Sequence, residues 1–422
     1  MAEIAPFRGI RYNPARIKDL SRVVCPPYDV ISPRRQNDLY RAHPCNIIRI
    51  DFGKVFPADS HKNNRYIRAK AFLHNWQKKI LIQDKLPSIY LYAQEYTYQD
   101  EKFTRWGFIC RLKLRDDGSV LFHEKTSTKP KRDRFHLIKE TKLNLNPVFS
   151  LFSDERGLIL SLVKYYRNRK LLIDIDFDNV RHRLWAVSDK KWIRRIIKTF
   201  LRKNIFIADG HHRYEVSLAY QRFCKKRNPR HTGKEDYNYI MMYFTPLEDK
   251  ALRILPTHRL LKELPPDFAR GLERYFDIVA CGKKGEIFSL MDRAGGKEHI
   301  FGMYRGKNKF CVLKLKKGLA LDELIRINKP LSWKRLDVSI LHTLVVEKIF
   351  GIKNSDFKSI IYTQDIREAI REVDRGNFRT AFFLNPTSSD QVKEVALDGA
   401  RMPHKSTYFY PKLLSGLVIN TV

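Results

Sequence analysis

Cysteine is scarce in this sequence and follows no pattern. Six cysteines are scattered over 422 residues. Structural zinc sites and disulfide frameworks need cysteines at short paired spacings, and the sequence has no such pair. We therefore expect reduced thiols, without a zinc site and without a disulfide scaffold.

Long apolar runs are missing as well. No stretch has the length of a transmembrane helix, and the start MAEIAPFRGIRYN has charges and Pro6 where a signal peptide would have its apolar segment. Hydrophobic residues still make up 43% of the chain, which is ample for buried cores. Because 422 residues are too many for one ordinary core, we expect two or three domains in a globular, cytoplasmic protein that binds no membrane.

Acidic residues are few relative to basic ones. There are 46 Asp and Glu against 81 Lys and Arg, which gives a formal net charge of +35. Such an excess favours partners that carry phosphate, because bound phosphates release counterions. The basic residues are spread along the chain, however, and the denser segments alternate with apolar residues as solvated helix faces do. Nucleic-acid binding is therefore an alternative that the charge allows but does not favour over an anionic small substrate.

The stretch FIADGHHRYEVSLAY, residues 206–220, is the most informative part of the chain. Its apolar start predicts a short buried strand, Gly210 permits a sharp turn, and Tyr214 and Leu218 follow at helical spacing. The first free N–H groups of that helix then lie just after the glycine. A strand that turns into a helix through a polar cluster is a typical place for chemistry.

The polar residues at this turn suit a phosphate. Backbone N–H groups at a helix start attract anions, and Arg213 adds a guanidinium that can bind two phosphate oxygens. Asp209, His211 and His212 complete the cluster. The histidines could instead only cap the helix, but with Asp209 and Arg213 beside them we favour a functional site.

A second polar cluster, LFHEKTSTKPKRDRF, occupies residues 121–135. His123 and Glu124 end a predicted strand, and several cations, including Arg134, follow in the loop and the first helical turn. A carboxylate in such surroundings can stay ionised and accept a hydroxyl proton, so Glu124 is a candidate general base. A salt-bridged turn explains the same residues equally well.

Three further segments carry side chains suited to a site. In LPTHR, a proline breaks the chain and places His258 and Arg259 in the next predicted turn. The closing MPHKSTYFYPK has Lys405 and Lys412 among hydroxyls and aromatics, although its aromatic run could also be a terminal core strand. In PPYDV, two prolines constrain Asp29, which either points at a site or caps a turn.

The motif DGHHR, followed by a helix with small residues, resembles the glycine-x-x-arginine signature of the ParB/sulfiredoxin superfamily. The residues of the motif are most similar to those of the free serine kinase branch of this superfamily. The resemblance implies that the motif cradles nucleotide phosphates. Those kinases also carry a His-Glu pair upstream, whose glutamate is the base, and this implies the same role for Glu124. Sulfiredoxins have a reactive cysteine where this chain has His211, so the resemblance does not extend to cysteine chemistry.

A wider set of motifs runs along nearly the whole chain: PPYDVIS, HEKT with its downstream DR, IADGHHRYE, LPTHR, LDVSILH and MPHKSTYFYPK. In this order they resemble the bacterial DUF1015 family, a family of unknown function. The resemblance is specific for the family and says little about the reaction.

These patterns predict a mixed α/β fold, because strand and helix periods alternate and hairpins occur among them. By the resemblance, a ParB/sulfiredoxin-like unit occupies residues 88–262. An N-terminal α/β segment, residues 1–87, carries PPYDV, and a C-terminal α/β region, residues 263–422, carries KSTYFYPK. Paired prolines after Leu264 mark the boundary between the last two.

Several elements are expected in detail. Ser32, followed by proline, predicts a helix start, and the polar pair Asp178-Asn179 predicts the turn of a hairpin. Residues 88–114 are expected to form a long antiparallel hairpin, and residues 46–52 a strand.

Taken with the resemblance, the residues favour an enzyme, namely a nucleotide-binding phosphotransferase that acts on a small hydroxyl-bearing metabolite. Free serine is the first candidate substrate, and ATP or ADP with Mg²⁺ are the expected cofactors; Asp209 is expected to help hold the metal or the nucleotide. The alternatives are a ParB-like nucleic-acid-binding protein, a phosphatase and a non-catalytic nucleotide sensor. The candidate catalytic residues are Glu124, His123, Asp209 and His212. The candidate cofactor-binding residues are Gly210, His211, Arg213, Arg134, His258, Arg259, Lys405 and Lys412.

These clusters sit at strand ends and helix starts, where polar groups can point into a cleft. We expect them to converge on one pocket, joined by either Asp29 or the segment 405–412.

Overall fold

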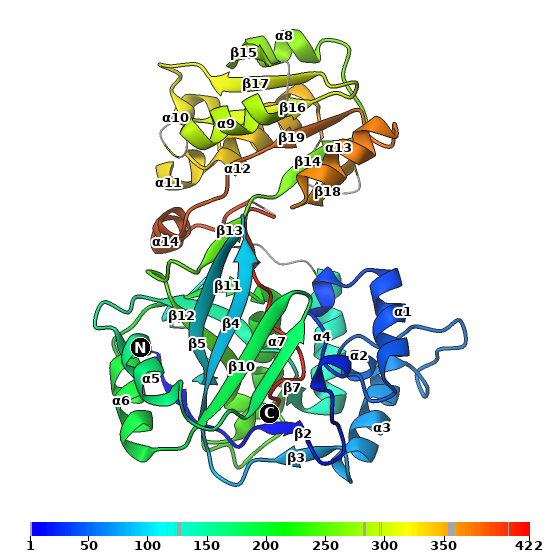
Figure 1. The fold of residues 1–422 in the computed structure, drawn as a ribbon, viewed down its shortest axis with the longest axis vertical. Helices are drawn as coiled ribbons and strands as arrows, with labels where there is room; N and C mark the ends of the chain where they lie inside the picture. The colour runs from blue at the N-terminus through cyan, green and yellow to red at the C-terminus, as the bar shows by residue number, and fades with distance from the viewer. Residues whose placement is uncertain are drawn as a thin grey trace. The chain divides into compact units, whose positions relative to one another are not determined.

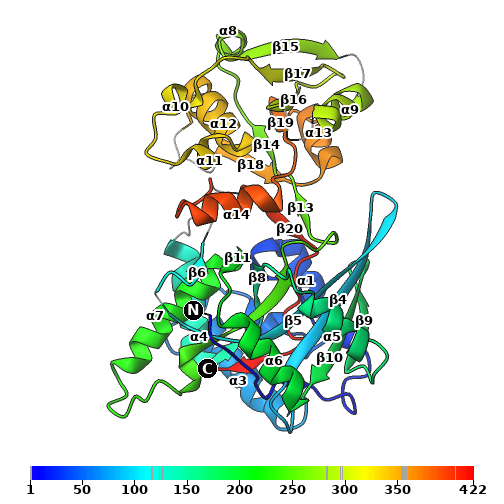
Figure 2. The same ribbon diagram turned by 90° about the vertical axis from the view of Figure 1, so that its left-hand side faces the viewer.

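The computed structural model describes residues 2–115, 117–122, 124, 128–281, 284–294, 296, 298–352, 359–403 and 405–422. They form two compact units. The first unit contains Met1–Leu121, Thr126–Arg253 and Pro411–Val422, and the second contains Phe122–Lys125 and Ile254–Tyr410. Both units combine helices with sheets (Figures 1 and 2), so the expected mixed α/β fold is confirmed.

A nine-stranded sheet forms the centre of the first unit, with the order β6-β11-β8-β12-β5-β4-β10-β9, and β1 pairs with β5. The strands are β1 (Ile4–Ala5), β4 (Ile89–Tyr98), β5 (Glu101–Lys113), β6 (Val120–Leu121), β8 (Val148–Phe152), β9 (Ile173–Phe177), β10 (Val180–Val187), β11 (Ile205–Asp209) and β12 (Tyr239–Pro246). β8 is buried along its whole length and β12 from Ile240 onward, which explains their continuous apolar sequences.

The two expected hairpins are confirmed. β4 and β5 pair in antiparallel register from Tyr98 to Tyr90, and Gln99 and Asp100 turn the chain with φ of 50° and 63°. β9 and β10 are joined in the same way by Asp178 and Asn179, with φ of 49° and 60°. Two successive residues at positive φ match the twist of the strands that they connect.

Helices cover both faces of this sheet. α6 (Lys190–Phe200) packs through Phe200, whose ring contacts three phenylalanines of the sheet. On the other face, α7 (His211–Lys225) contacts β8 and β12, α4 (Thr128–Thr141) contacts α7, and α3 (Arg65–Gln77) contacts α4. α5 (Leu158–Tyr166) contacts β4 and β5. These layers bury the strand that carries the DGHHR motif.

Short helices lie between β1 and β4 in the chain. α1 (Pro33–Ala42) begins as expected, because the Ser32 hydroxyl accepts a hydrogen bond from the N–H of Arg35. The expected strand at residues 46–52 is wrong, since these residues form α2 (Ile48–Asp51). Asn46 decides this: its side-chain oxygen accepts from the N–H of Ile48, and its amide donates to the backbone carbonyls of Arg22 and Val24, which favours a helical turn.

The second unit has a six-stranded sheet with the order β15-β17-β16-β19-β14-β18. Its strands are β14 (His258–Leu261), β15 (Phe276–Cys281), β16 (Ile300–Tyr304), β17 (Phe310–Leu315), β18 (Ile360–Thr363) and β19 (Thr380–Phe383). α9 (Lys284–Ala294) and α13 (Ile366–Asp374) bury a core against this sheet. The other helices of the unit are α8 (Phe268–Glu273), α10 (Leu321–Leu324), α11 (Leu331–Lys334), α12 (Asp337–Ile340), the π-helix η4 (Leu341–Ile349) and α14 (Ser389–Leu397). β13 (Arg253–Leu255) pairs with β20 (Tyr408–Tyr410).

The last residues of the chain belong to the first unit. β21 (Asn420–Thr421) pairs with β7 (Leu143–Asn144), Ile419 bridges to Ile10, and Ser415 bridges to Cys25. β2 (Ile10–Tyr12) also pairs with β3 (Leu81–Gln83). The C-terminal segment thus runs beside the N-terminal segment and beside β7.

None of the helices in the described ranges combines the length and the apolar character needed to span a bilayer.

Candidate functional site

The junction of β11 and α7 has the strand-glycine-helix geometry that the sequence predicts. Gly210 connects the two elements with φ of 94° and ψ of 26°, a left-handed conformation that favours glycine. A Cβ atom at this position would lie 2.8 Å from the guanidinium of Arg213. The missing side chain therefore serves two purposes, since it allows the turn and gives the arginine room to fold back over it.

Arg213 is held in place by backbone and side-chain acceptors. Its guanidinium donates to the carbonyl of Pro147 at 2.5 Å and to the side-chain oxygen of Asn146. It also lies 3.8 Å from the carboxylate of Asp209, one turn earlier. These contacts fix the guanidinium at the start of α7, where backbone N–H groups already favour an anion.

Lys412 joins the same site from the far end of the sequence. Its ammonium binds the carboxylate of Asp209 at 2.8 Å. Burial alone would raise the pKa of Asp209, but the charges of Lys412 and Arg213 outweigh it and hold the pKa well below its usual range. Asp209 is therefore a carboxylate that holds two cations in position.

Two buried side chains hold the backbone beside Lys412. Gln94 donates to the carbonyl of Lys412 at 2.9 Å, and Arg105 donates to the carbonyl of Pro411 at 2.6 Å and to the side chain of Gln94. Arg105 also lies over the ring of Phe149, 4.5 Å from its centroid. The sheet thus fixes the main chain from which Lys412 reaches Asp209.

Arg134 approaches the site from α4. It donates to the side chain and the carbonyl of Asp51 at 2.9 and 2.8 Å, and it lies 2.6 Å from the carboxylate of Asp133. Its guanidinium stacks on the ring of Tyr28, 4.1 Å from the centroid. Burial raises the pKa of Tyr28 far above its usual value even though Arg134 and Arg213 oppose that shift, so this phenol stays a hydroxyl donor.

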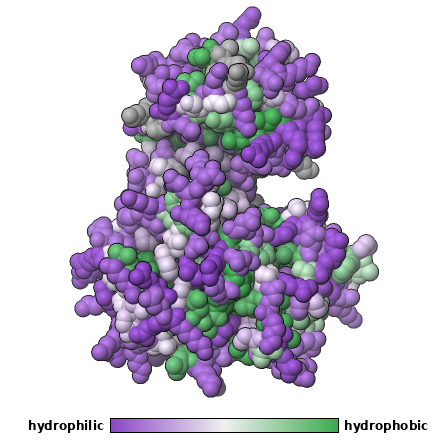
Figure 3. Space-filling view, in the orientation of Figure 1, coloured by the Kyte–Doolittle hydropathy of each residue, from purple (hydrophilic) through white to green (hydrophobic). Residues whose placement is uncertain are grey.

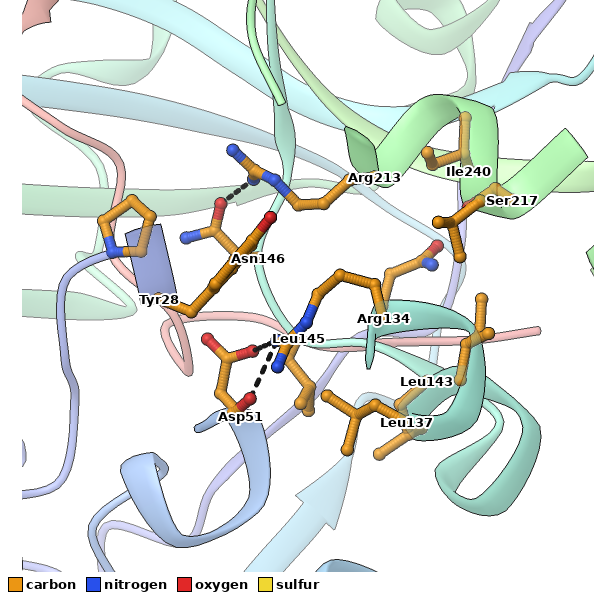
Figure 4. Close-up of a pocket in the computed structure, with 14 residues that line it drawn as sticks. Tyr28, Asp51, Arg134, Leu137, Leu143, Leu145, Asn146, Arg213, Ser217 and Ile240 are labelled. Carbon is orange, nitrogen blue, oxygen red and sulfur yellow. Dashed lines mark hydrogen bonds and ion pairs between the residues drawn. The ribbon is translucent and has the colours of Figure 1, made fainter. Parts of the chain in front are cut away.

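A chain of hydrogen bonds links the two arginines. Asp51 accepts from Arg134 and, at 2.7 Å, from the hydroxyl of Ser415. That hydroxyl accepts from the amide of Asn146 at 3.2 Å, and the oxygen of the same amide accepts from Arg213. Figure 4 shows both guanidinium groups directed toward the region around Tyr28 and Asn146. The network preorganises two cations at one place.

A cavity of about 50 Å³ lies between these groups. One wall is polar and includes Asp51, Arg134, Asn146 and Arg213, whereas the rest is largely apolar. The apolar part is formed by Leu137, Ile138, Leu143, Leu145, Val216 and Ile240. Such a volume accommodates a few water molecules or a group of the size of a phosphoryl.

The structure brings together seven of the twelve predicted site residues in the first unit. These are Arg134, Asp209, Gly210, His211, His212, Arg213 and Lys412. His211 is buried in the first turn of α7, while His212, next to it, is half-buried. Asp29 is exposed beside Tyr28 in the turn Tyr28–Val30.

The other predicted residues belong to the second unit or lie outside the described residues. His123 is outside them. Glu124 forms an isolated bridge with Met402 in the second unit, which also contains His258, Arg259 and Lys405. The expected convergence of these residues with Arg213 stays a prediction.

The expected turn at His258 and Arg259 is wrong, because both residues lie in β14. Successive side chains of a strand point to opposite faces, so the two do not form one cluster. His258 contacts the ring of Phe383, and burial lowers its pKa to about 3. Arg259 donates to the carbonyl of Thr257 and, at 3.4 Å, to that of Lys405, and burial lowers its pKa to about 10.

Sequence reasoning did not single out Asp51, Asn146, Ser415, Gln94 or Arg105. Asp51 falls in the segment expected as a strand, and the others occur singly among apolar residues. No local pattern distinguishes them, since their partners lie far away in the sequence.

The described residues of this site do not form a preformed metal centre. In the part of the chain that the structure describes, no three His, Cys, Asp or Glu side chains are grouped so as to hold a metal ion. Asp51 and Asp209 are occupied by cations of the protein. The described residues therefore do not fit Mg²⁺ without a ligand that brings its own oxygens.

Among solved structures, the chain is similar to a conserved hypothetical protein from Pyrococcus furiosus, with a TM-score of 0.38, 10% identity, and coverage of 74% of this chain and 95% of that protein. It is also similar to a free serine kinase mutant in complex with ADP (TM-score 0.37, 11% identity, coverage 73% and 92%). A third is SbnI with a C-terminal truncation from Staphylococcus aureus (TM-score 0.35, 9% identity, coverage 73% and 85%). At such scores these similarities assign no activity to this chain.

Comparison with curated proteins gave no match. A family model described as "Protein of unknown function (DUF1015)" matches residues 4–339, which include both arginines of the site and the whole DGHHR motif. This match spans most of the chain and confirms the resemblance seen in the motifs. The chain belongs to the DUF1015 family.

Proposed function

We propose that the protein is a nucleotide-dependent phosphotransferase that acts on a small hydroxyl-bearing metabolite, with free serine as the first candidate. The observation that carries the proposal is the start of α7, where Arg213 folds over Gly210 at a cavity that Arg134 also lines. Backbone N–H groups at a helix start, combined with two fixed guanidinium groups, are suited to phosphate oxygens.

Phosphoryl transfer depends on charge stabilisation and positioning more than on covalent chemistry. Both guanidinium groups are already oriented by acceptors, so little reorganisation is needed when a phosphate arrives. Lys412 is held 2.8 Å from Asp209 and adds a third cation. A bound phosphate would accept hydrogen bonds from Arg213 and Lys412, either beside Asn146 and Asp209, which accept them now, or in their place.

The other candidate residues take their roles from the motif resemblance. Glu124 would orient and deprotonate the acceptor hydroxyl. The N–H groups of His211 and His212, together with Arg213, would hold the nucleotide phosphates. Mg²⁺ would bind mainly through those phosphates, where it neutralises charge, because the described side chains offer no centre for the ion alone.

Nucleotide binding is tested with a thermal-shift panel of nucleotides and metabolites. A ligand at a hundred times its Kd stabilises the fold by about 2.7 kcal/mol, which is easily detected. Arg213→Ala should abolish the shift, and Arg195→Ala, at an exposed position of α6, should leave it unchanged. If the wild type is stabilised by no nucleotide, the proposal fails.

Catalysis is tested by product analysis with ATP or ADP and serine. Glu124→Gln should lower turnover by a factor of about 100 or more while nucleotide binding persists. Free phosphate without a phosphorylated acceptor would identify a phosphatase, and binding without any product would identify a sensor. Turnover within about twofold of wild type in both Glu124→Gln and Arg213→Ala would show that these roles are wrong.

A further inference from the structure

A basic groove lies on the surface of the second unit, in a region that the proposed phosphotransferase site does not use. The groove encloses about 440 Å³ and is lined by Lys284, Asn308, Phe310, Arg367, Ile370, Arg371, Asp374 and Arg375. Four of the eight are cations and one is an acid. In Figure 3, hydrophilic side chains cover the part of this unit where Figure 1 shows α13.

The cations are regularly spaced. Arg367, Arg371 and Arg375 follow one another at intervals of four residues along α13 and its C-terminal cap, so they share one face of the helix. At 1.5 Å per residue, this row is about 12 Å long. All three are exposed. A row of this length matches an extended polyanion better than a single phosphate.

The charge of the groove is not neutralised by the protein. Within the described ranges, Lys284, Arg367 and Arg371 have no ion-pair partner, whereas Arg375 lies 3.4 Å from Glu372. The one acid of the lining, Asp374, accepts a hydrogen bond from the hydroxyl of Tyr304 at 2.5 Å. Three cations thus remain available to a partner.

The turn between β16 and β17 extends this basic surface. Tyr304, which ends β16, holds the turn against α13 through Asp374 and also accepts from the N–H of Asn308 at 3.4 Å. The two lysines on either side of Asn308, Lys307 and Lys309, are exposed. The buried Tyr304 therefore holds the backbone of the turn against α13, which keeps the exposed cations of both segments on one surface.

The residues that line the groove also indicate how it would recognise a partner. Phe310 is buried, and the described residues that line the groove include no exposed aromatic ring, so they offer bases no platform on which to stack. Arginines and lysines without such a platform bind phosphates and carry no sequence information. Recognition here would be independent of sequence.

We propose that this groove binds the phosphodiester backbone of a nucleic acid. The inference is independent of the phosphotransferase proposal, because none of its residues belongs to the site in the first unit. It also gives a location to part of the net charge of +35, which the first unit's site, where the cations are paired with acids, leaves unexplained.

The test is a fluorescence-anisotropy titration of the full chain with labelled single-stranded RNA and with duplex DNA of arbitrary sequence, at 50 to 300 mM salt. With three phosphate contacts, log K for the single strand should fall against log salt with a slope of about −2 or steeper. Arg367→Gln/Arg371→Gln should reduce that slope by about 1.4 and weaken binding about tenfold at 50 mM salt. Whichever of the two ligands, RNA or duplex DNA, binds more tightly identifies the kind of nucleic acid that the groove prefers.

The matched control is Arg194→Gln/Arg195→Gln, which removes the same charge at exposed positions of α6. It should change affinity by less than about twofold, and both double variants should melt as the wild type does. No binding at 100 mM salt, or equal losses in both double variants, would overturn the groove as the site. Equal binding of polyglutamate would show that the surface takes acidic polypeptides, and the nucleic-acid assignment would then be wrong.

Discussion

The ion pair between Lys412 and Asp209 should stabilise the first unit measurably. The change Lys412→Met keeps most of the length of the side chain and removes its charge. The two side chains are only 13% and 17% exposed, and Asp209 would keep Arg213 as a partner at 3.8 Å. Removing one partner of a fully buried pair costs 3–5 kcal/mol, so for this pair we expect a loss of about 2 kcal/mol at pH 7.

The pH dependence of the loss in unfolding free energy distinguishes the ion pair from a general weakening of the fold. The folded-state pKa of Asp209 lies below its unfolded value, so the stabilisation is complete above the unfolded pKa, near 4, and is lost as the pH falls toward the folded pKa. The difference between wild type and Lys412→Met should therefore be full at neutral pH and shrink below about pH 4. A general weakening of the fold would not show this convergence.

Urea unfolding followed by tryptophan fluorescence measures this effect. Four of the five tryptophans, residues 76, 106, 185 and 192, are in the first unit, so the signal reports chiefly on it. Lys198→Met, an exposed change on α6, is the control for loss of a lysine charge. A free energy of unfolding for Lys412→Met within about 0.5 kcal/mol of wild type, or a difference that stays constant down to pH 3, would refute the reasoning.

Three further changes test the geometry of the first unit. Gly210→Ala should destabilise it by about 1–2 kcal/mol and displace Arg213, because the new Cβ meets the guanidinium at positive φ; urea unfolding and the nucleotide thermal shift should both report it. Ser415→Ala should cost about 1–3 kcal/mol in urea unfolding, since it removes a buried donor from Asp51. Burial lowers the pKa of His182 to about 3, so the unfolded state takes up its proton first and stability is lost as the pH falls from about 6.5 to 3; His182→Gln should lose less stability than wild type over that range.

Local sequence alone determined several parts of this protein. The strand, glycine and helix around Gly210, the two hairpins with the turn at Asp178-Asn179, and the helix start after Ser32 follow from residues that are neighbours in the chain. Turn chemistry, capping and apolar periodicity act over a few residues, so the sequence is sufficient to predict them. The family also follows from the sequence, because its motifs occur in a fixed order.

Other features depended on contacts that local patterns do not contain. Residues 46–52 alternate like a strand but form a helical turn, since Asn46 binds backbone groups of the segment 22–24. The chemistry of LPTHR suggested one polar cluster, yet β14 sends His258 and Arg259 to opposite faces. In both cases tertiary pairing outweighed the local pattern.

The candidate site shows most clearly which features follow from local sequence and which depend on tertiary contacts. Asp209 and Arg213 were recognisable because they flank a glycine at a helix start, one turn apart. Lys412 reaches Asp209 across 203 positions, and Ser415 reaches Asp51 across 364. Such contacts form only when the C-terminal segment pairs beside the N-terminal one, and that pairing is set by burial and backbone hydrogen bonds summed over the whole unit. The sequence alone thus determined which groups could bind an anion, and only the tertiary structure decided which of them meet.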